Sequence, residues 1–200
     1  CVNVCPHFAS PKVKWMTARQ VMDAVLPNCA FLRGITVSGG ECTLYPGFLE
    51  ELFTLAKAAG LSALIDSNGM APFAPLAGLM AVTDGVMLDV KAWEPGVYRA
   101  LTGAASNTVV RENLRYLAET GKLEELRVVF VPGMVDAGAI LRGAADTLGE
   151  RAARTRLKLI AFRNFGVRGR LAGAPAPDGA QMAALEETAR ACGFADIVRV

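Results

Sequence analysis

The feature that most constrains the fold of this sequence is a repeated alternation of short apolar runs with segments of helical spacing. Six runs rich in Val, Ile and Leu are expected to form strands, and helical patterns separate them. The expected strands are residues 34–38, 64–66, 85–89, 126–131, 157–162 and 197–200. Such alternation predicts α/β units with a parallel sheet, and the near-continuous apolar character of the strands predicts that helices cover both of its faces.

The segments between the strands carry helix signals of several kinds. Thr17 and Gln20 have the spacing of a capping box, and either Ser106 or Asn107 is expected to cap a later helix. The expected helices cover residues 17–26, 48–59, 75–80, 107–120, 137–148 and 178–192. Residues 163–177, rich in Gly, Arg and Pro, are expected to form a long loop. The aromatic side chains of Trp93, Phe162 and Phe165 are expected to pack in the protein interior.

Composition narrows the class of protein. A chain of 200 residues with 52% hydrophobic content suits one domain, and a net charge of +2 gives no sign of a nucleic-acid partner. No apolar run is long enough to cross a membrane, and no secretory signal is visible. An odd number of cysteines, five, argues against a disulfide framework and predicts a reducing compartment, the cytoplasm. Because the first residue is Cys1, a preceding segment is expected to be missing.

Polar clusters follow four of the expected strands. They are Ser-Gly-Gly-Glu at 38–41, Asp-Ser-Asn-Gly at 66–69, Asp-Val-Lys at 89–91 and Arg-Asn at 163–164. Ligands of parallel α/β folds bind at the carboxyl ends of the strands, so these clusters are expected to form one site. Arg127, within the fourth strand, is expected to point into the same site.

The residue types in these clusters suit a small charged ligand. Gly39 and Gly40 allow close backbone approach, and Glu41 can accept a hydrogen bond from an amine. Asp66 and Asp89 have the oxygen ligands that a small cation prefers. Each motif has a simpler interpretation as well. The Gly-Gly and Asp-Ser-Asn-Gly segments are also typical turns, and an Asp-Lys pair two residues apart can be a surface ion pair of little energy.

Taken together, these motifs resemble those of the radical S-adenosylmethionine activases of glycyl radical enzymes, the pyruvate formate-lyase activase group. Val-Met-Leu-Asp-Val-Lys at 86–91, Leu-Thr-Gly at 101–103 and Val-Pro-Gly at 131–133 match that pattern in order with the clusters above. The resemblance covers residues 16–200 and looks closest to the YjjW-type subgroup. It implies a partial (βα)6 TIM-like barrel that lacks its first strand.

The resemblance also implies cofactors and site residues. S-adenosyl-L-methionine would contact Gly39, Gly40 and Glu41 through its amino group, with Asp89, Val90 and Lys91 beside its methionine and ribose. Arg127 and Arg163 would complete the cofactor site, although the family has a histidine in place of Arg163. A monovalent cation would lie among Asp66, Met87 and Asp89.

The N-terminal cysteines are interpreted separately. Cys1 and Cys5 have the spacing of the first two cysteines in the radical motif C-x3-C-x2-C, but Phe8 stands at the third position. They match instead the end of a bacterial ferredoxin motif. Residues 1–15 are therefore expected to be the remnant of a ferredoxin-like insert with an accessory 4Fe-4S cluster, although two unliganded thiols are almost as compatible with the sequence. The catalytic cluster motif is absent from these 200 residues, so this chain is expected to be inactive by itself.

The implied activity is generation of a 5′-deoxyadenosyl radical from S-adenosylmethionine by a 4Fe-4S cluster, followed by formation of a glycyl radical on a partner enzyme. Flavodoxin or ferredoxin would donate the electron, and neither nucleic acid nor membrane is an expected partner. Two alternatives remain open at this point. One is a non-radical α/β-barrel lyase with Lys91 as its amine nucleophile. The other is a module that binds the cofactor without catalysis.

Overall fold

A computed structural model describes residues 14–200 of the chain. Cys1, Cys5 and nearly all of the 1–15 segment lie outside the described residues, so the predicted accessory cluster stays a prediction. Within the described range, no helix combines the length and the apolar character that a membrane crossing requires.

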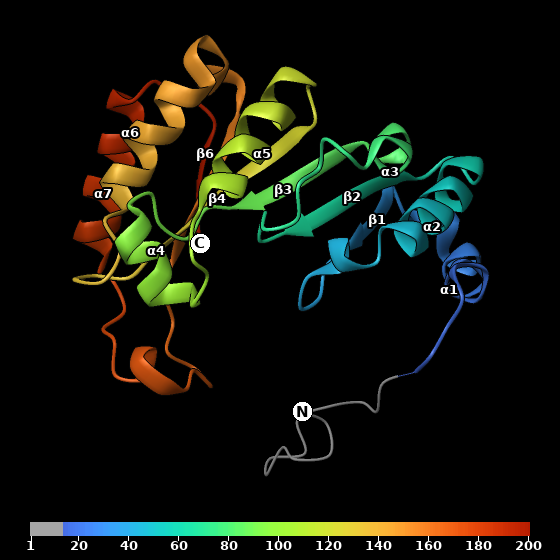
Figure 1. The fold of residues 1–200 in the computed structure, drawn as a ribbon, viewed down its shortest axis with the longest axis horizontal. Coiled ribbons are helices and arrows are strands. Elements are labelled where there is room, and N and C mark those ends of the chain that lie inside the picture. Colours follow the sequence, from blue (N-terminus) through green and yellow to red (C-terminus); the bar gives the residue numbers. More distant parts are fainter. Residues whose placement is uncertain (1–13) are drawn as a thin grey trace.

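Six strands form one parallel sheet, and their order in space is their order along the chain. They are β1 (Gly34–Val37), β2 (Ser62–Ser67), β3 (Gly85–Asp89), β4 (Leu123–Phe130), β5 (Arg156–Ala161) and β6 (Ile197–Arg199). Because all six run in the same direction, their carboxyl ends lie along one edge of the sheet (Figure 1). The predicted strands are confirmed, with ends that differ by at most three residues.

Seven α-helices connect and flank these strands in the described part of the chain. They are α1 (Ala18–Val25), α2 (Pro46–Ala58), α3 (Ala77–Val82), α4 (Pro95–Thr102), α5 (Thr108–Glu119), α6 (Ala137–Leu148) and α7 (Gly179–Ala191). Short 3-10 helices are η1 (Leu26–Phe31), η2 (Cys42–Leu44), η3 (Gly149–Arg154) and η4 (Gly169–Leu171). In Figure 1, α1, α2 and α3 lie beside β1 and β2, and α5, α6 and α7 beside the later strands.

Burial alternates along the strands and separates the two faces of the sheet. Ile65 in β2 and Leu159 in β5 are fully buried, whereas their neighbours Asp66 and Lys158 are only half-buried. One face therefore packs in the apolar core that the helices complete, and the other face carries polar side chains. The expectation that helices cover both faces of the sheet is wrong for residues 14–200. The strands read as continuous apolar runs because long aliphatic side chains also occur on the polar face.

The helix ends show how local sequence sets their limits. The hydroxyl of Thr17 accepts a hydrogen bond from the amide of Gln20, and the Gln20 side chain accepts one from the amide of Thr17. This confirms the predicted capping box. Asn107 occupies the N-cap position of α5 as expected, but its side chain makes no capping bond and turns instead toward the segment after β3.

The sequence pattern does not predict helix α4. Its eight residues begin with Pro95 and Gly96, which are typical of loops, and Tyr98 is its only buried side chain. The Tyr98 hydroxyl donates to the sulfur of Met70 at 2.9 Å, so tertiary contact holds the helix in place.

The expectation that Phe165 packs inside is wrong, because this side chain is 98% exposed, whereas Phe162 is buried.

Candidate functional site

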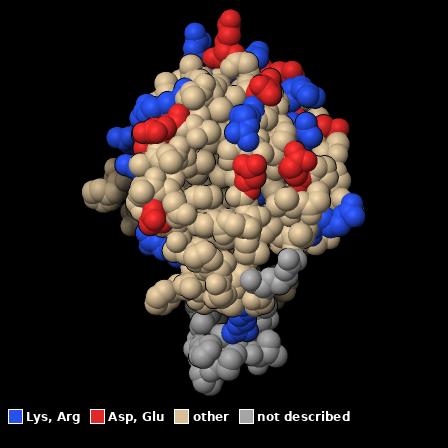
Figure 2. Space-filling model, turned by 90° about the vertical axis from the view of Figure 1, so that its left-hand side faces the viewer, with Lys and Arg blue, Asp and Glu red and all other residues tan. Residues whose placement is uncertain are grey.

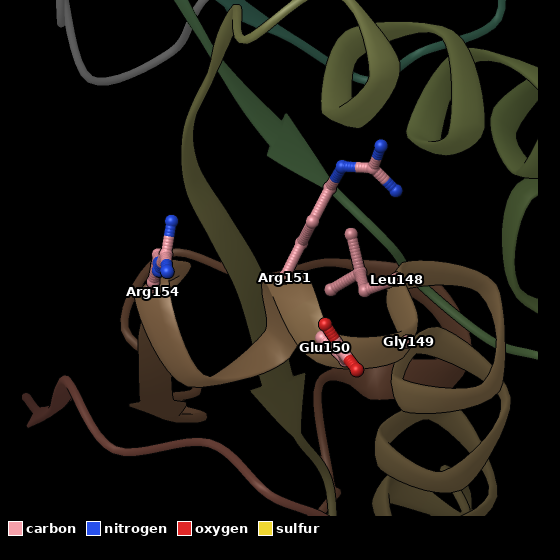
Figure 3. Close-up of a pocket in the computed structure, with 5 residues that line it drawn as sticks. All are labelled: Leu148, Gly149, Glu150, Arg151 and Arg154. Carbon is pink, nitrogen blue, oxygen red and sulfur yellow. The ribbon is translucent and has the colours of Figure 1, made fainter.

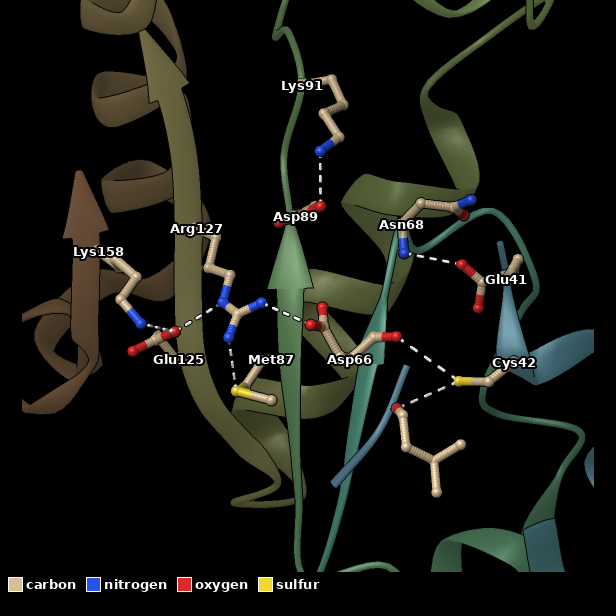
Figure 4. A network of polar contacts seen from close by, with 11 residues as sticks. Glu41, Cys42, Asp66, Asn68, Met87, Asp89, Lys91, Glu125, Arg127 and Lys158 are labelled. Carbon is tan, nitrogen blue, oxygen red and sulfur yellow. Dashed lines mark hydrogen bonds and ion pairs between the residues drawn. The ribbon is translucent and has the colours of Figure 1, made fainter. Parts of the chain in front are cut away.

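The loop after β1 is joined to the end of β2 through the carboxylate of Glu41. Its Oε1 atom accepts hydrogen bonds from the Thr43 amide and hydroxyl and from the Ser67 hydroxyl, the last at 2.9 Å. Its Oε2 atom accepts one from the Asn68 amide at 2.8 Å (Figure 4). Glu41 therefore holds two loops together, and only Oε2 keeps room for a further donor. The contact of Glu41 with a ligand amine stays a prediction, and only the Oε2 atom has room to make it.

Gly39 and Gly40 lie on the exposed side of the same loop. Gly39 has a φ of 151°, a conformation that side-chain-bearing residues rarely adopt. A Cβ atom built on either glycine would meet no other atom within 4 Å. The backbone of this loop is thus open to a ligand, as the sequence predicts.

The thiol of Cys42 holds the ends of β1 and β2 together. Its thiol lies 3.5 Å from the carbonyl oxygens of both Val37 in β1 and Asp66 in β2 (Figure 4). Burial raises the pKa of the Cys42 thiol from 9.0 to about 11, and the negative charge of Glu41 adds to the effect. A thiol that stays protonated is a poor nucleophile, so Cys42 is a structural hydrogen-bond donor.

The half-buried face of the sheet carries a network of charged side chains. The guanidinium of Arg127 donates to Asp66 through Nη1 at 2.7 Å and to Glu125 through Nε at 2.6 Å. Its Nη2 atom lies 2.9 Å from the sulfur of Met87, and Lys158 pairs with the same Glu125 oxygen at 3.2 Å (Figure 4). Arg127 thus contacts two other candidate residues, Asp66 and Met87, and its predicted contact with a cofactor stays a prediction.

Opposing effects set the ionisation of Arg127. Burial lowers its pKa, but hydrogen bonds to Glu125 and Asp66 outweigh burial, and the pKa is raised above its ordinary value. The guanidinium is therefore a fixed positive charge at the centre of this face.

Sequence reasoning missed Glu125 and Lys158. The period of two along β4 places Glu125 beside Arg127, and the sheet register pairs Arg127 with Lys158.

Asp89 and Lys91 form their own ion pair at the end of β3, with Lys91 Nζ 2.6 Å from Asp89 Oδ2. Val90 between them is buried, and its amide donates to the carbonyl of Arg127. The Lys91 amine is thus held in an ion pair and is not free to attack a substrate, which disfavours the lyase alternative.

Lys91 also borders an apolar pocket of about 280 Å³ at the carboxyl ends of the strands. The other lining residues are Leu101, Thr102, Val129, Val131, Val135, Phe162 and Leu171. Apolar walls with one charged residue at the rim suit a mostly apolar ring that carries a polar group. Arg163 is exposed, and its predicted contact with a cofactor stays a prediction.

A second hollow, of about 400 Å³, lies far from this network. Leu148, Gly149, Glu150, Arg151 and Arg154 line it (Figure 3). These residues immediately precede β5, so the hollow is at the amino-terminal edge of the sheet, away from the strand ends that carry the polar clusters.

On the face that Figure 2 shows, acidic and basic side chains are interspersed and neither sign dominates.

The sequence matches the model of the Radical SAM superfamily over residues 5–138. The chain belongs to this superfamily. The "Putative glycyl-radical enzyme activating enzyme" of Haemophilus influenzae is 32% identical over 90% of the chain and 75% of its own length. This likeness places the chain in the activating-enzyme family.

Other relatives agree with that family. The pyruvate formate-lyase-activating enzyme of Streptococcus mutans is 41% identical over 52% of the chain, and pyruvate formate-lyase 1-activating enzyme of Escherichia coli is 32% identical over 62%. The chain spans 41% and 52% of the lengths of these two relatives.

Solved structures show the same fold at low identity. A domain of pyruvate-formate lyase-activating enzyme from Bacteroides vulgatus has a TM-score of 0.68 at 16% identity, covering 84% of this chain and 98% of that domain. Streptococcus suis SuiB has a TM-score of 0.69 at 14% identity, covering 94% of this chain and 44% of its own. The predicted α/β radical SAM fold is confirmed.

Proposed function

We propose that this radical SAM chain is the cofactor-binding part of an activating enzyme that installs a glycyl radical on a partner enzyme. The observation that carries the proposal is the joining of the loops after β1 and β2 by Glu41 beside the open backbone of Gly39 and Gly40. Family membership supports the same conclusion.

The residues present fit S-adenosylmethionine. The open Gly39–Gly40 backbone and Oε2 of Glu41 would hold its amino group, and Lys91 would face its carboxylate or ribose. The apolar pocket beside Lys91 has the character that an adenine ring requires. When bound, the cofactor and a 4Fe-4S cluster supply the radical chemistry, and this chain supplies orientation and charge.

The described residues do not contain the cluster ligands. Cys29, Cys42 and Cys192 are the cysteines of residues 14–200, and no group of three or more His, Cys, Asp or Glu side chains in that range is arranged to hold a metal ion. We therefore assign no step to the cluster. The roles of Cys1 and Cys5 in an accessory cluster, and of residues 1–15 as an insert remnant, are proposals from the motif alone.

A monovalent cation between Asp66, Met87 and Asp89 is a separate proposal. Both carboxylates are present, but Arg127 already pairs with Asp66 and contacts Met87, and Lys91 pairs with Asp89. A cation fits only if Arg127 moves away from Asp66. The cation would then increase cofactor affinity in potassium buffer relative to a buffer with a large organic cation, and equal affinities would contradict it.

The proposed partners follow from the family. The protein substrate would be a glycyl radical enzyme, and flavodoxin or ferredoxin would donate the electron. We place the reaction in the cytoplasm, because a reduced cluster and free thiols both require a reducing compartment.

Calorimetric titration with S-adenosylmethionine tests the cofactor site. Gly40→Val fills space that no atom of the chain occupies, so we expect the fold to tolerate it and cofactor affinity to fall by about tenfold or more. Gly47→Val is the matched control, since a Cβ atom there also meets nothing within 4 Å but lies at the start of α2. Equal affinities for the two variants would contradict the assignment.

The radical activity has its own tests. The gene sequence upstream of Cys1 is expected to encode C-x3-C-x2-C after a predicted strand, and its absence would end the proposal. For protein that includes this motif, anaerobic reconstitution with iron and sulfide followed by reduction with dithionite is expected to cleave S-adenosylmethionine to methionine and 5′-deoxyadenosine. A glycyl radical signal on the partner, measured by electron paramagnetic resonance, identifies the final product.

A further inference from the structure

Two buried asparagines, Asn113 within helix α5 and Asn107 at its N-cap position, have side-chain amides that do not serve the helix itself. Asn107 is 2% exposed and Asn113 is 3% exposed. A buried amide is costly unless its hydrogen-bonding groups are paired, so the partners of these side chains show what they hold. In both cases the partners are backbone groups of loops that carry candidate site residues.

Asn113 holds the loop after β2 at three points. Its Oδ1 atom accepts a hydrogen bond from the Phe73 amide at 2.9 Å. Its Nδ2 atom donates to the carbonyl oxygens of Gly69 and Ala71, each at 2.8 Å. One side chain thus fixes alternate residues of a loop that begins with Asn68, the residue whose amide binds Glu41.

The contact continues from this loop to the glycine loop after β1. The amide of Gly69 donates to the hydroxyl of Ser67 at 2.9 Å, and that hydroxyl donates to Glu41 Oε1 at 2.9 Å. Ser67 is 2% exposed, so water does not compete effectively for these bonds. A continuous set of hydrogen bonds therefore runs from Asn113 through Gly69 and Ser67 to Glu41, next to Gly40.

Asn107 holds the segment after β3 in a similar way. Its Nδ2 atom donates to the carbonyl oxygens of Ala92 at 3.1 Å and Trp93 at 2.7 Å. These residues directly follow Lys91, the candidate cofactor residue at the rim of the apolar pocket.

We propose that Asn113 and Asn107 are positioning residues, through which α5 sets the relative placement of the loops after β1, β2 and β3. Both side chains are buried and their amides bond loop backbone, so they would act through Glu41 and Lys91. Asn113 orients the Glu41 and glycine-loop side of the site, and Asn107 orients Lys91. The relevance of this arrangement to S-adenosylmethionine rests on the proposed function.

The test compares Asn113→Leu with Leu117→Ala in the purified protein. Asn113→Leu keeps most of the side-chain volume and removes all three hydrogen bonds to the loop. Leu117 is fully buried on the same helix, and its truncation weakens packing without touching the loop. Hydrogen exchange of the amides in residues 68–73 and calorimetric affinity for S-adenosylmethionine are measured at a temperature at which both variants are folded.

We expect Asn113→Leu alone to accelerate exchange in residues 68–73 and to weaken cofactor binding by about tenfold. Asn107→Ala is expected to weaken binding while leaving exchange in residues 68–73 unchanged. If Leu117→Ala lowers affinity as much as Asn113→Leu, or if loop exchange is unchanged in Asn113→Leu, the proposal is wrong.

Ser67→Ala provides a second route if Asn113→Leu does not fold. It removes the link between Gly69 and Glu41 and leaves α5 intact. We expect weaker cofactor binding in this variant, and full affinity would overturn the proposal. If the unmodified protein does not bind S-adenosylmethionine, the proposed function fails, while loop exchange in Asn113→Leu still decides whether Asn113 positions the loop.

Discussion

The guanidinium of Arg127 reaches across strand β3 to bind the carboxylate of Asp66 at 2.7 Å, although the two residues are 61 positions apart. Met87 of β3 lies between them in the sheet and offers its sulfur to the same guanidinium. Arg127 also binds Glu125, and Lys158 pairs with the same carboxylate, so two positive charges balance two carboxylates on the half-buried face. This ion network keeps the floor of the candidate site polar without leaving a charge unpaired.

Arg127→Gln is expected to lower the free energy of unfolding by about 2 kcal/mol, because it leaves Asp66 without its partner in a half-buried position. The loss is smaller than for a fully buried pair, since Lys158 still pairs with Glu125. Urea unfolding measures it. Arg142→Gln is the control, because its pair with Asp136 is exposed and 3.9 Å long, and we expect a change below about 0.5 kcal/mol. Equal losses in the two variants would refute a stabilising network.

Much of the fold was predictable because its signals are local. The strands are short β-branched runs between helical patterns, and the Thr17–Gln20 capping box needs only four residues of sequence. The convergence of the strand ends follows from the parallel topology alone, so the joint placement of Glu41 and Asn68 was predictable as well.

The details that escaped prediction depend on partners distant in sequence. Helix α4 is held by the contact between Tyr98 and Met70, and Asn107 turns from its capping role to the carbonyls of Ala92 and Trp93. Glu41 carries a charge that suits a ligand amine, but two of its observed partners, Ser67 at the end of β2 and Asn68 after it, lie 26 and 27 residues further along the chain. Local propensity carries no information about these contacts.

Cys42 is expected to resist alkylation by iodoacetamide in the folded protein at pH 8. Its thiol is buried, and its pKa of about 11 leaves almost no thiolate at that pH. Cys29 and Cys192 are half-buried and serve as internal controls, read by peptide mapping in the mass spectrometer. Alkylation of Cys42 at the rate of Cys29 would contradict its burial.

The same pKa shift predicts the alkaline stability of the protein. The unfolded thiol loses its proton near pH 9, whereas the folded thiol keeps it up to about pH 11. Because the folded state binds more protons in this window, the contribution of Cys42 to stability is complete below pH 9 and declines between pH 9 and 11. Cys42→Ala is expected to flatten this part of a urea-unfolding profile, and a parallel profile would contradict the shift.

Asp84 is expected to give the stability of the protein a pH dependence of opposite sign, at acid pH. Burial raises the pKa of its carboxyl, but hydrogen bonds from Lys57 and from the Ala63 amide outweigh burial and lower the pKa below 3.8. The stability that this carboxylate contributes is complete above the unfolded pKa and is lost as the pH falls through the lower folded value. Asp84→Asn is expected to lose less stability than the unmodified protein between pH 5 and pH 3. Identical pH profiles of the two proteins would contradict the assignment.

Trp93 packs between two helices directly after the candidate site segment. Arg111 of α5 lies over its ring, 4.5 Å from the centroid, and Gly143 of α6 lies against the Cε2 and Nε1 atoms of the indole. A Cβ atom on Gly143 would overlap Cε2 of Trp93, so no larger residue fits unless the ring moves. The indole, Asn107 and α6 together restrict the path of the chain beyond Lys91.

Gly143→Ala is therefore expected to destabilise the protein by about 2 kcal/mol through overpacking, despite the higher helix propensity of alanine. Gly138→Ala on the same helix is the matched control, because its Cβ atom would meet only the flexible end of Arg142 and the exposed Asp136 carboxylate. We expect that control to change stability by less than about 1 kcal/mol and in the stabilising direction. Adding Trp93→Leu to Gly143→Ala should remove the clash, so the double variant is expected to be more stable than the sum of the two single changes predicts. Additive losses in thermal unfolding would show that the indole does not limit the size of residue 143.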